Sequence, residues 1–389
     1  MHSLKRIPYI TATHIFSDGP GTFLNRYLKE HKISHGAILH PFTFSPQKSS
    51  RYILWEKDSE TIKEGRSFPP YALLYYLRDI IGILIFGWKH PSEIGIGFNN
   101  LNTIALLFLR ALGRIKKVIY VTVDYTPIRF PGRFMNAIYH WIDTWCLTRA
   151  DILWDSAEAM KEARIQKGIP EHKIRPTIIV EDGNDFLESK IKPIEELHHY
   201  ELVYMGSMRD HQGISLFMEV GQMLSQENPN IQLLLMGGGE KLSFFKDYAK
   251  KLDIESITTF TGFIEDHQVL QERLRFGYLG FALYEDHPES FSRYSAVGKP
   301  KVYMGSGLPV VITNVPEIAK RIEESNGGII VPYDKNVIAE KVRKILLDEN
   351  MYKKMRESAI SFAKKNTWEN TFKEAFQKTQ KILNYELQS

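Results

Sequence analysis

The stretch that decides the fold runs from Glu285 to Val311 and reads EDHPESFSRYSAVGKPKVYMGSGLPVV. It opens with an acidic loop broken by Pro288, and a short segment carrying Lys299 follows. The small residues 305–307 then precede an apolar run, 308–313, whose pattern predicts a buried strand. A loop, a short helix and a glycine-punctuated turn into an apolar strand form half of a nucleotide-binding α/β unit. We therefore expect an α/β domain with a ligand site around this stretch.

Length and composition indicate a globular protein of more than one domain. The chain has 389 residues, of which 43% are hydrophobic and 25% charged. A single hydrophobic core rarely supports this length, so we expect two domains. The net charge of +4 is too small to indicate nucleic acid, but it is compatible with an anionic ligand or an anionic membrane surface. The single cysteine, Cys146, cannot form an intramolecular disulfide and favours a reducing, cytoplasmic location.

Two segments could be mistaken for targeting or membrane segments. The N-terminal residues 1–16 lack a continuous apolar core and a small-residue cleavage site, so we interpret them as containing a first strand and not as a signal peptide. Residues 70–88 are strongly apolar, yet Arg78 and Asp79 in their middle would be costly in hydrocarbon. We expect a helix running into a strand there.

The first half of the chain alternates between strand and helix patterns. Strands are predicted at 7–13, 36–39, 94–98, 118–123 and 152–155, and helices at 22–31, 71–83, 101–112 and 134–148. This rhythm predicts a parallel sheet with helices on both faces, and ligands of such sheets bind at the carboxyl ends of the strands. The candidates on that rim are Gly19 and Gly21 of the loop 14–21, then Asn99, Asn100, Asp124, Tyr125 and Ser156.

Two of these candidates have plain structural alternatives. A glycine loop between a first strand and a first helix offers backbone N–H groups to an anion or a sugar hydroxyl, but many α/β proteins have such a turn without a ligand. Asp124 can face a cleft and bind an acceptor hydroxyl, or it can cap the turn before Pro127.

Basic and aromatic residues are mixed between positions 110 and 145. They are Arg110, Arg114, Lys116, Lys117, Arg129, Phe130, Arg133, Phe134, Tyr139, Trp141 and Trp145. Such a mixture on amphipathic helices suits an interface with anionic lipid headgroups. The alternative is a solvated basic face above a packed core face.

The second half repeats the α/β rhythm after a polar stretch, 181–201, that we interpret as a linker. We assign a first domain to 1–190, completed by a C-terminal helix at 368–389, and a second domain to 198–367. The second domain's predicted strands lie at 202–208, 231–239, 257–263, 279–284 and 308–313, and its predicted helices at 214–227, 240–252 and 266–276. Two such domains joined by a linker predict a deep inter-domain cleft.

From Leu202 to about Leu347 the chain resembles the donor-binding domain of retaining GT-B glycosyltransferases, most closely glycosyltransferase family four. YMGSMRDHQGISLFMEV is similar to the family's glycine loop and helix, LLLMGGGE to its next strand and loop, and SAVGKPKVYMGSGLPVVITNVPEI to its P-x-K-x-x-E-Y-M-A-x-G-x-P-V-V signature. The first half matches loosely, through VDYTP-x-RF and ADILWDSAEAM. The resemblance implies a GT-B fold with two Rossmann-like domains and a C-terminal helix that crosses back to the first.

The resemblance also implies a nucleoside-diphosphate sugar as donor, bound mainly by the second domain. Arg209 and Lys299 would supply the two cations that stabilise the diphosphate leaving group, with Asp124 as a third catalytic candidate and no metal or other cofactor. The implied donor-binding residues are Gly206, Ser207, Gly237, Gly238, Glu289, Ser290, Phe291 and Tyr303, and the implied acceptor-side residues are Gly19, Gly21, Asn99 and Tyr125.

The chain departs from the family pattern at two positions. Gln212 replaces the loop lysine, and Val302 replaces the glutamate that usually holds the ribose. An apolar side chain cannot accept that hydrogen bond. The family's other glutamate falls on Tyr294 by spacing and on Glu289 by local sequence. We therefore expect ribose to be held differently here.

The predicted function is retaining transfer of a sugar to a glycan or lipid-linked acceptor, in the synthesis of a cell-surface polysaccharide or glycoconjugate. Its implied location is the cytoplasm, with possible peripheral contact with the inner face of an anionic membrane, and no nucleic acid is expected as a partner. Two alternatives remain: a sugar-nucleotide epimerase on the same fold, and a catalytically silent GT-B subunit that binds a partner enzyme or a glycan.

Overall fold

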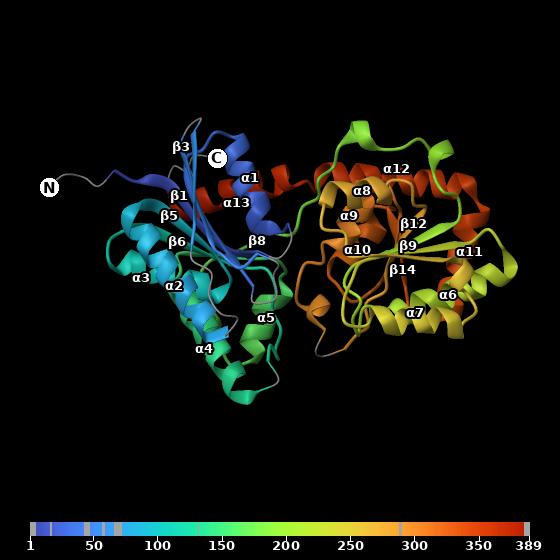
Figure 1. Ribbon diagram of the computed structural model, residues 1–389, viewed down its shortest axis with the longest axis horizontal. Helices are drawn as coiled ribbons and strands as arrows, with labels where there is room; N and C mark the ends of the chain where they lie inside the picture. The colour runs from blue at the N-terminus through green and yellow to red at the C-terminus, as the bar shows by residue number, and fades with distance from the viewer. Residues whose placement is uncertain are drawn as a thin grey trace. The chain divides into compact units, whose positions relative to one another are not determined.

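The computed structural model describes residues 5–15, 18–42, 47–56, 59–65, 72–130, 132–287 and 290–384. It divides into two units, one formed by residues 1–181 with 368–389 and the other by 182–367 (Figure 1). The polar stretch 181–201, expected as a linker, lies almost wholly in the second unit. There it forms two short 3-10 turns, Glu188–Lys190 and Ile194–Glu196.

The first unit is built on an eight-stranded sheet with the order β4-β3-β2-β1-β5-β6-β7-β8. Its strands are β1 Ile7–Ile15, β2 His35–Pro41, β3 Arg51–Glu56, β4 Ser59–Glu64, β5 Ser92–Phe98, β6 Ile115–Thr122, β7 Ile152–Asp155 and β8 Thr177–Ile179. Strands β2, β1 and β5 to β8 are parallel, whereas β3 and β4 add an antiparallel hairpin at one edge. The predicted parallel sheet is present, and β1 lies in its middle.

Helices cover both faces of this sheet. They are α1 Pro20–Glu30, α2 Ala72–Lys89, α3 Asn99–Ala111, α4 Arg133–Arg149, α5 Ala159–Gln166 and the C-terminal α13 Trp368–Leu383. One core packs Ile10 of β1 with side chains of α2, α3 and α4, and a second packs Tyr9 with side chains of α1 and α13. Successive strand residues point to opposite faces, so α2, α3 and α4 cover one face and α1 and α13 the other.

One sequence-based expectation was wrong in this unit, and one hairpin of the unit was not expected. Residues 70–88 were expected to run from a helix into a strand, but Ala72–Lys89 is one continuous helix. The hairpin β3–β4 was not expected, because every residue of Ser59–Glu64 is exposed and the strand therefore lacks the apolar alternation that marks a buried face. Within the described residues, no helix is long and apolar enough to cross a membrane.

The C-terminal helix α13 packs on the first unit, as the resemblance implied. Trp368 stacks on Phe23 of α1 with the ring centroids 4.5 Å apart, and Phe376 lies 5.3 Å from Tyr9. Ile382, near the end of this helix, is 41% exposed. Leu383, seven residues after Phe376 and hence two helical turns on, packs against this core instead.

The second unit has a six-stranded, fully parallel sheet with the order β11-β10-β9-β12-β13-β14. Its strands are β9 Glu201–Met205, β10 Gln232–Met236, β11 Thr258–Gly262, β12 Leu279–Ala282, β13 Val310–Thr313 and β14 Gly328–Val331. Its helices are α6 Ile214–Glu227, α7 Leu242–Lys251, α8 His267–Leu274, α9 Lys299–Gly305, α10 Ile318–Glu324, α11 Lys335–Leu347 and α12 Glu349–Lys365.

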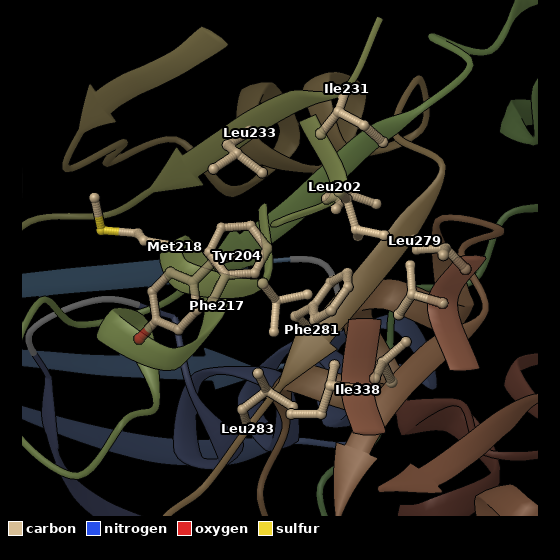
Figure 2. Packing of buried hydrophobic residues seen from close by; sticks show 14 of the residues in the cluster. Leu202, Tyr204, Phe217, Met218, Ile231, Leu233, Leu279, Phe281, Leu283 and Ile338 are labelled. Atoms are coloured by element: carbon tan, nitrogen blue, oxygen red, sulfur yellow. The ribbon is translucent and has the colours of Figure 1, made fainter. Parts of the chain in front are cut away.

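One core of this unit joins the central strands to the covering helices. Figure 2 shows Leu202 and Tyr204 of β9, Leu279 and Phe281 of β12, and Phe217 of α6 gathered together, all of them buried. Strands buried on both faces read as continuous apolar runs, which is why the sequence located β9, β10, β12 and β13 without difficulty. This core fixes the loops that follow β9, β10 and β12 at one edge of the sheet.

Candidate functional site

The two glycine loops that follow β9 and β10 are hydrogen-bonded to each other. The Gly206 N–H donates to the Met236 carbonyl (2.9 Å), and the Met208 N–H donates to the Gly238 carbonyl (2.8 Å). Gly237 has a φ of +146°, and a Cβ atom there would lie 1.9 Å from the Gly206 carbonyl oxygen. Only glycine permits this conformation and this close approach. The predicted residues Gly206, Gly237 and Gly238 therefore lie together.

The turn into α6 needs glycine for the same reasons. Gly213 has a φ of +69°, and a Cβ atom there would lie 1.7 Å from the Leu283 carbonyl oxygen. The loop after β9 is therefore packed against the backbone that follows β12. The three loops after β9, β10 and β12 form one backbone-to-backbone platform.

The side chain of Lys299 reaches this platform from the start of α9. Its Nζ atom donates to the amide oxygen of Gln212 (3.0 Å) and to the hydroxyl of Tyr204 (3.3 Å). The same ammonium lies 4.5 Å from the ring centroid of Tyr204 and 5.0 Å from that of Tyr284. A Cβ atom on Gly206, whose φ is +142°, would come within 2.9 Å of the Lys299 Nζ and Cε atoms.

The Lys299 ammonium has no counter-ion among the described residues. Burial, together with the smaller effect of the positive charge of Arg209, lowers the pKa of Lys299 to about 7. Aromatic faces and a neutral amide partly compensate a buried ammonium, but they carry no negative charge. In the part of the chain that the structure describes, no carboxylate forms an ion pair with Lys299. A bound anion would restore the charge balance and raise the pKa of this lysine.

Arg209 lies in the same loop as Gly206 but is exposed. Its Nη2 atom donates to the hydroxyl of Ser207 (3.2 Å), whose side chain is also exposed. The exposed guanidinium can turn toward a ligand at the platform. The predicted cations Arg209 and Lys299 are thus brought to one loop, together with the predicted donor-side residue Ser207.

The remaining donor-side candidates divide into three cases. Tyr303 is fully buried, and its hydroxyl accepts from the Met205 N–H (2.6 Å) and donates to the Phe281 carbonyl (3.2 Å), so it joins β9 to β12 inside the core. Ser290 is buried and shares a 2.5 Å hydrogen bond with Ser292. Phe291 begins a 3-10 turn, and Glu289 lies outside the described residues.

Gln212 is a functional candidate whose importance the sequence did not show. It is 5% exposed and holds the Lys299 ammonium through its amide oxygen. The family pattern places a lysine at this position, and here the positive charge reaches the same spot from Lys299 of α9. Gln212 and Lys299 lie 87 positions apart in the chain, and a single sequence does not show that they meet.

The acceptor-side candidates lie in the first unit. Asn99 follows β5 and has a φ of +66°, which is uncommon for a residue other than glycine. Gly19 precedes α1 in an extended conformation with open space around its Cα atom. Gly21 is buried, and a Cβ atom there would lie 2.5 Å from the Thr13 hydroxyl, so this glycine serves packing between α1 and β1.

The remaining rim candidates of the first unit are mostly internal. Tyr125 is 1% exposed and packs near the Arg164 guanidinium, 5.5 Å from its ring centroid. Asn100 and Ser156 are buried and donate to backbone carbonyls, those of Tyr139 and Val123 respectively. Asp124 is partly exposed after β6, so of this group it has the accessibility that a ligand contact needs.

A buried polar cluster beside the first glycine loop was not anticipated. His14 of β1 lies 3.0 Å from Asp79, His40 of β2 lies 3.1 Å from it, and Arg78 donates to it at 2.6 Å. Burial acts to raise the pKa of Asp79, but the hydrogen bond from His14 and the neighbouring positive groups outweigh it and lower that pKa. Burial lowers the pKa of His40 to about 3. Arg78 and Asp79 are thus a neutralised internal pair.

The structure offers little for metal coordination. Across the described ranges, no group of three His, Cys, Asp or Glu side chains is arranged to hold a metal ion. The positive charge at the platform comes from Lys299 and Arg209 instead.

Comparison with known proteins agrees with this geometry. Residues 199–348 match the family model of glycosyl transferases group 1. A search of curated proteins gave no match. Among solved structures, sucrose-phosphate synthase from Thermosynechococcus elongatus is similar over 97% of this chain and 100% of its own, with 15% identity and a TM-score of 0.70.

Two further structures are similar at comparable levels. Anabaena HepE in complex with UDP and glucose has 12% identity and a TM-score of 0.66, with 96% of this chain and 100% of the other covered. The E. coli structure described as trehalose-6-phosphate bound with UDP-2-fluoro glucose has 12% identity and a TM-score of 0.65, with 96% and 98% covered. The predicted GT-B fold and the predicted resemblance are confirmed, as is the predicted enzyme class, a glycosyltransferase.

Proposed function

We propose that the chain moves a sugar from a nucleoside-diphosphate sugar to a hydroxyl of a glycan or lipid-linked acceptor, with retention of the anomeric configuration and without a metal. The observation that carries the proposal is the Lys299 ammonium, which lies beside the Gly206 turn with no carboxylate partner in the described residues. A partly buried cation without a counter-ion is costly unless a ligand supplies the negative charge. A diphosphate at the platform would do so.

The second unit would stabilise the departing diphosphate. The bond between the anomeric carbon and the phosphate oxygen breaks, the acceptor oxygen bonds to the same face of that carbon, and the acceptor's proton passes to the departing phosphate. Negative charge grows on the diphosphate as the bond breaks, so donors placed beside it lower the barrier. Lys299 would act from its fixed position, and Arg209 would turn in from the exposed side of the loop.

The residues of the first unit would meet the acceptor. Asp124 is the candidate for holding the acceptor hydroxyl, and Asn99 and Gly19 are candidates for further contacts at the same sheet edge. The similar structures that contain UDP or a UDP-sugar make UDP the first nucleotide to test. A product in a cell-surface polysaccharide or glycoconjugate, made on the cytoplasmic side, completes the proposal.

Binding is tested first. Thermal-shift measurements with UDP, GDP, dTDP and CMP identify the base, because a ligand that binds the folded state raises its melting temperature. One diphosphate should raise the melting temperature clearly more than the others. Failure of all of them at millimolar concentration would contradict the proposal.

Turnover is tested next, as release of nucleoside diphosphate from a matching sugar donor in the presence of an acceptor panel. Lys299→Ala should lower this rate more than about tenfold, because a charge-assisted hydrogen bond contributes roughly 1.5–3 kcal/mol. The exposed Lys344→Ala on α11 is the matched control and should keep the wild-type rate. Wild-type rates in Lys299→Ala would contradict the assignment.

The same assay distinguishes the two alternative functions. Donor conversion without acceptor would identify an epimerase, and donor binding without any turnover would identify a silent subunit.

A further inference from the structure

Three neighbouring helices of the first unit expose apolar side chains on their outer side. α2 and α3 pack together, and so do α3 and α4, on one face of the first sheet (Figure 1). Along α2 the exposed residues are Leu74, Leu77, Ile81, Ile85 and Trp88, with exposed fractions from 39% to 54%. Their spacings of three, four, four and three residues place them on one stripe of the helix.

The exposed apolar surface continues over the other two helices. Phe108 and Leu112, at the end of α3, are 50% and 60% exposed. On α4, Phe134 is 76% exposed, Ile138 36% and Trp141 64%. We call the exposed apolar side chains of these three helices the α2–α4 face.

This face is additional to the core-facing side of the same helices. Ile83 and Phe86 of α2 are 0% and 9% exposed and pack against the sheet with Leu107 of α3. A surface helix of a globular protein normally has one apolar stripe toward the core and polar residues opposite it. On α2 both sides are apolar. Large contiguous exposed apolar patches on soluble proteins mark interaction sites.

The charges on the same helices are of one sign. Asp79 and Asp143 are the two acidic residues in the sequences of α2, α3 and α4, and each is 1% exposed. The exposed charged residues are basic, among them Lys89, Arg133 and Arg149. The outer side of the three helices is therefore apolar and cationic.

Two cations lie directly over aromatic rings at the margin of the face. The Arg114 guanidinium is 4.7 Å from the ring centroid of Trp88, and that of Arg149 is 4.9 Å from the ring centroid of Trp145. Arginine and tryptophan both place a charged or polar end near water and an apolar part deeper, which suits the boundary between lipid headgroups and acyl chains.

We propose that the α2–α4 face docks the first unit onto the surface of an anionic lipid bilayer. The apolar side chains would enter the boundary between headgroups and acyl chains, and the basic residues at its margin would meet the anionic headgroups. A second copy of the chain fits less well, because a symmetric contact through this face would bring cations against cations. A bilayer supplies both the apolar depth and the negative charge.

Membrane docking does not depend on the transfer chemistry or on Lys299. Docking and sugar transfer can therefore be tested separately. The purified full chain is mixed with vesicles of equal parts phosphatidylglycerol and phosphatidylcholine, or of phosphatidylcholine alone, and bound protein is measured by flotation. We expect binding to the anionic vesicles, at least about tenfold weaker binding to the neutral ones, and weakening by salt.

Three variants locate the contact. Ile81→Gln with Ile85→Gln on α2 should lower binding to the anionic vesicles by at least about tenfold, and Trp141→Gln on α4 should lower it severalfold. Phe244→Gln with Leu347→Gln is the control, because these side chains are 51% and 79% exposed on the second unit. The control should bind like the wild type.

The outcomes separate docking from its alternatives. No binding to anionic vesicles, or equal binding by the α2 variant and the wild type, would overturn the proposal. So would a dimer in light scattering that the α2 variant dissociates while vesicle binding is absent. Melting temperatures within a few degrees of wild type confirm that the variants fold. The α2 variant should still bind nucleoside diphosphate, so that loss of docking and failure of the proposed function remain distinguishable.

Discussion

The two units contain equivalent turns with different charges beside them. In each, the central strand of a parallel sheet, β1 or β9, runs through a glycine-containing loop into the first helix of the unit. Beside the turn after β9 the cation Lys299 has only neutral partners, Gln212 and Tyr204. Beside the strand end of β1 the nearby cation, Arg78, is neutralised by Asp79.

This difference shows that a glycine turn by itself does not define an anion site. Both turns can offer backbone N–H groups at a helix N-terminus. What distinguishes them is whether the fold buries a positive charge beside the turn and leaves it to be paired by a ligand. By this criterion we expect the turn after β9, and not the turn after β1, to bind the proposed diphosphate.

The largest expected effect is a difference in stability between glycine-to-alanine variants of the two turns. Gly237→Ala should destabilise the protein by roughly 3 kcal/mol, because it combines an unfavourable positive φ with a Cβ atom 1.9 Å from a carbonyl oxygen. Gly19→Ala should cost about 1 kcal/mol or less, because its φ is −161° and the space around it is open, so only the preference of the N-cap of α1 for glycine over alanine is lost. Urea unfolding of both variants measures the difference, and equal losses would break the comparison.

The next effect tests whether nucleoside diphosphate binding needs a positive charge beside the turn after β9, or needs Lys299 itself. Lys299→Met should weaken nucleoside diphosphate binding by about tenfold or more. Adding Gln212→Lys in the same chain returns a cation to the spot where the two side chains now meet, 3.0 Å apart. Calorimetry should show that the double variant recovers most of the lost affinity. If it binds as weakly as Lys299→Met, the cation acts from a different place.

A third expected effect concerns how the stability of each unit depends on pH. Burial lowers the pKa of His35 to about 4 and that of His40 to about 3. Below about pH 6.5 the unfolded chain takes up protons that the folded first unit does not, so stability falls as the pH falls. Lys299 acts in another window: between about pH 7 and 10.5 the unfolded chain holds a proton that the folded second unit has released, so stability rises with pH.

Unfolding measured from pH 4.5 to 9.5 separates these two windows. His35→Phe should reduce the loss of stability on the acid side by roughly 2 kcal/mol at pH 4.5, and Lys299→Met should flatten the rise above pH 7. His172→Gln, at an exposed position of the first unit, is the control. Identical acid profiles for His35→Phe and the control would contradict the contribution assigned to His35.

The sequence predicted the architecture well, because buried parallel strands and glycine turns leave strong local signals. The strands β9 to β13 of the second unit, the return of α13 and the meeting of Gly206, Gly237, Arg209 and Lys299 at one loop edge were foreseen from those signals or from the resemblance, whereas the edge strand β14 was not. The hairpin β3–β4 was not, because an exposed edge strand lacks the alternation that identifies a buried one.

The sequence did not show where individual side chains point, or which residues from different helices and strands meet. Tyr125 and Tyr303 were predicted to meet ligands because of their place in the chain, but both point into cores. The His14–Asp79 cluster and the Gln212–Lys299 pair each join residues more than sixty positions apart. In the sequence, Arg78 and Asp79 served only as an argument against a membrane-spanning helix. In the structure they form an internal ion pair.

The most direct test of the central claim is the affinity for UDP as a function of pH, measured by calorimetry between pH 7 and 9.5 for the wild type and for Lys299→Arg. Burial lowers the pKa of the free Lys299 to about 7, and a bound diphosphate would raise it. The wild-type affinity should therefore fall above pH 7, by up to about tenfold per pH unit, whereas that of Lys299→Arg should stay nearly flat because guanidinium keeps its proton. Parallel profiles for the two proteins would show that the Lys299 ammonium does not bind the diphosphate.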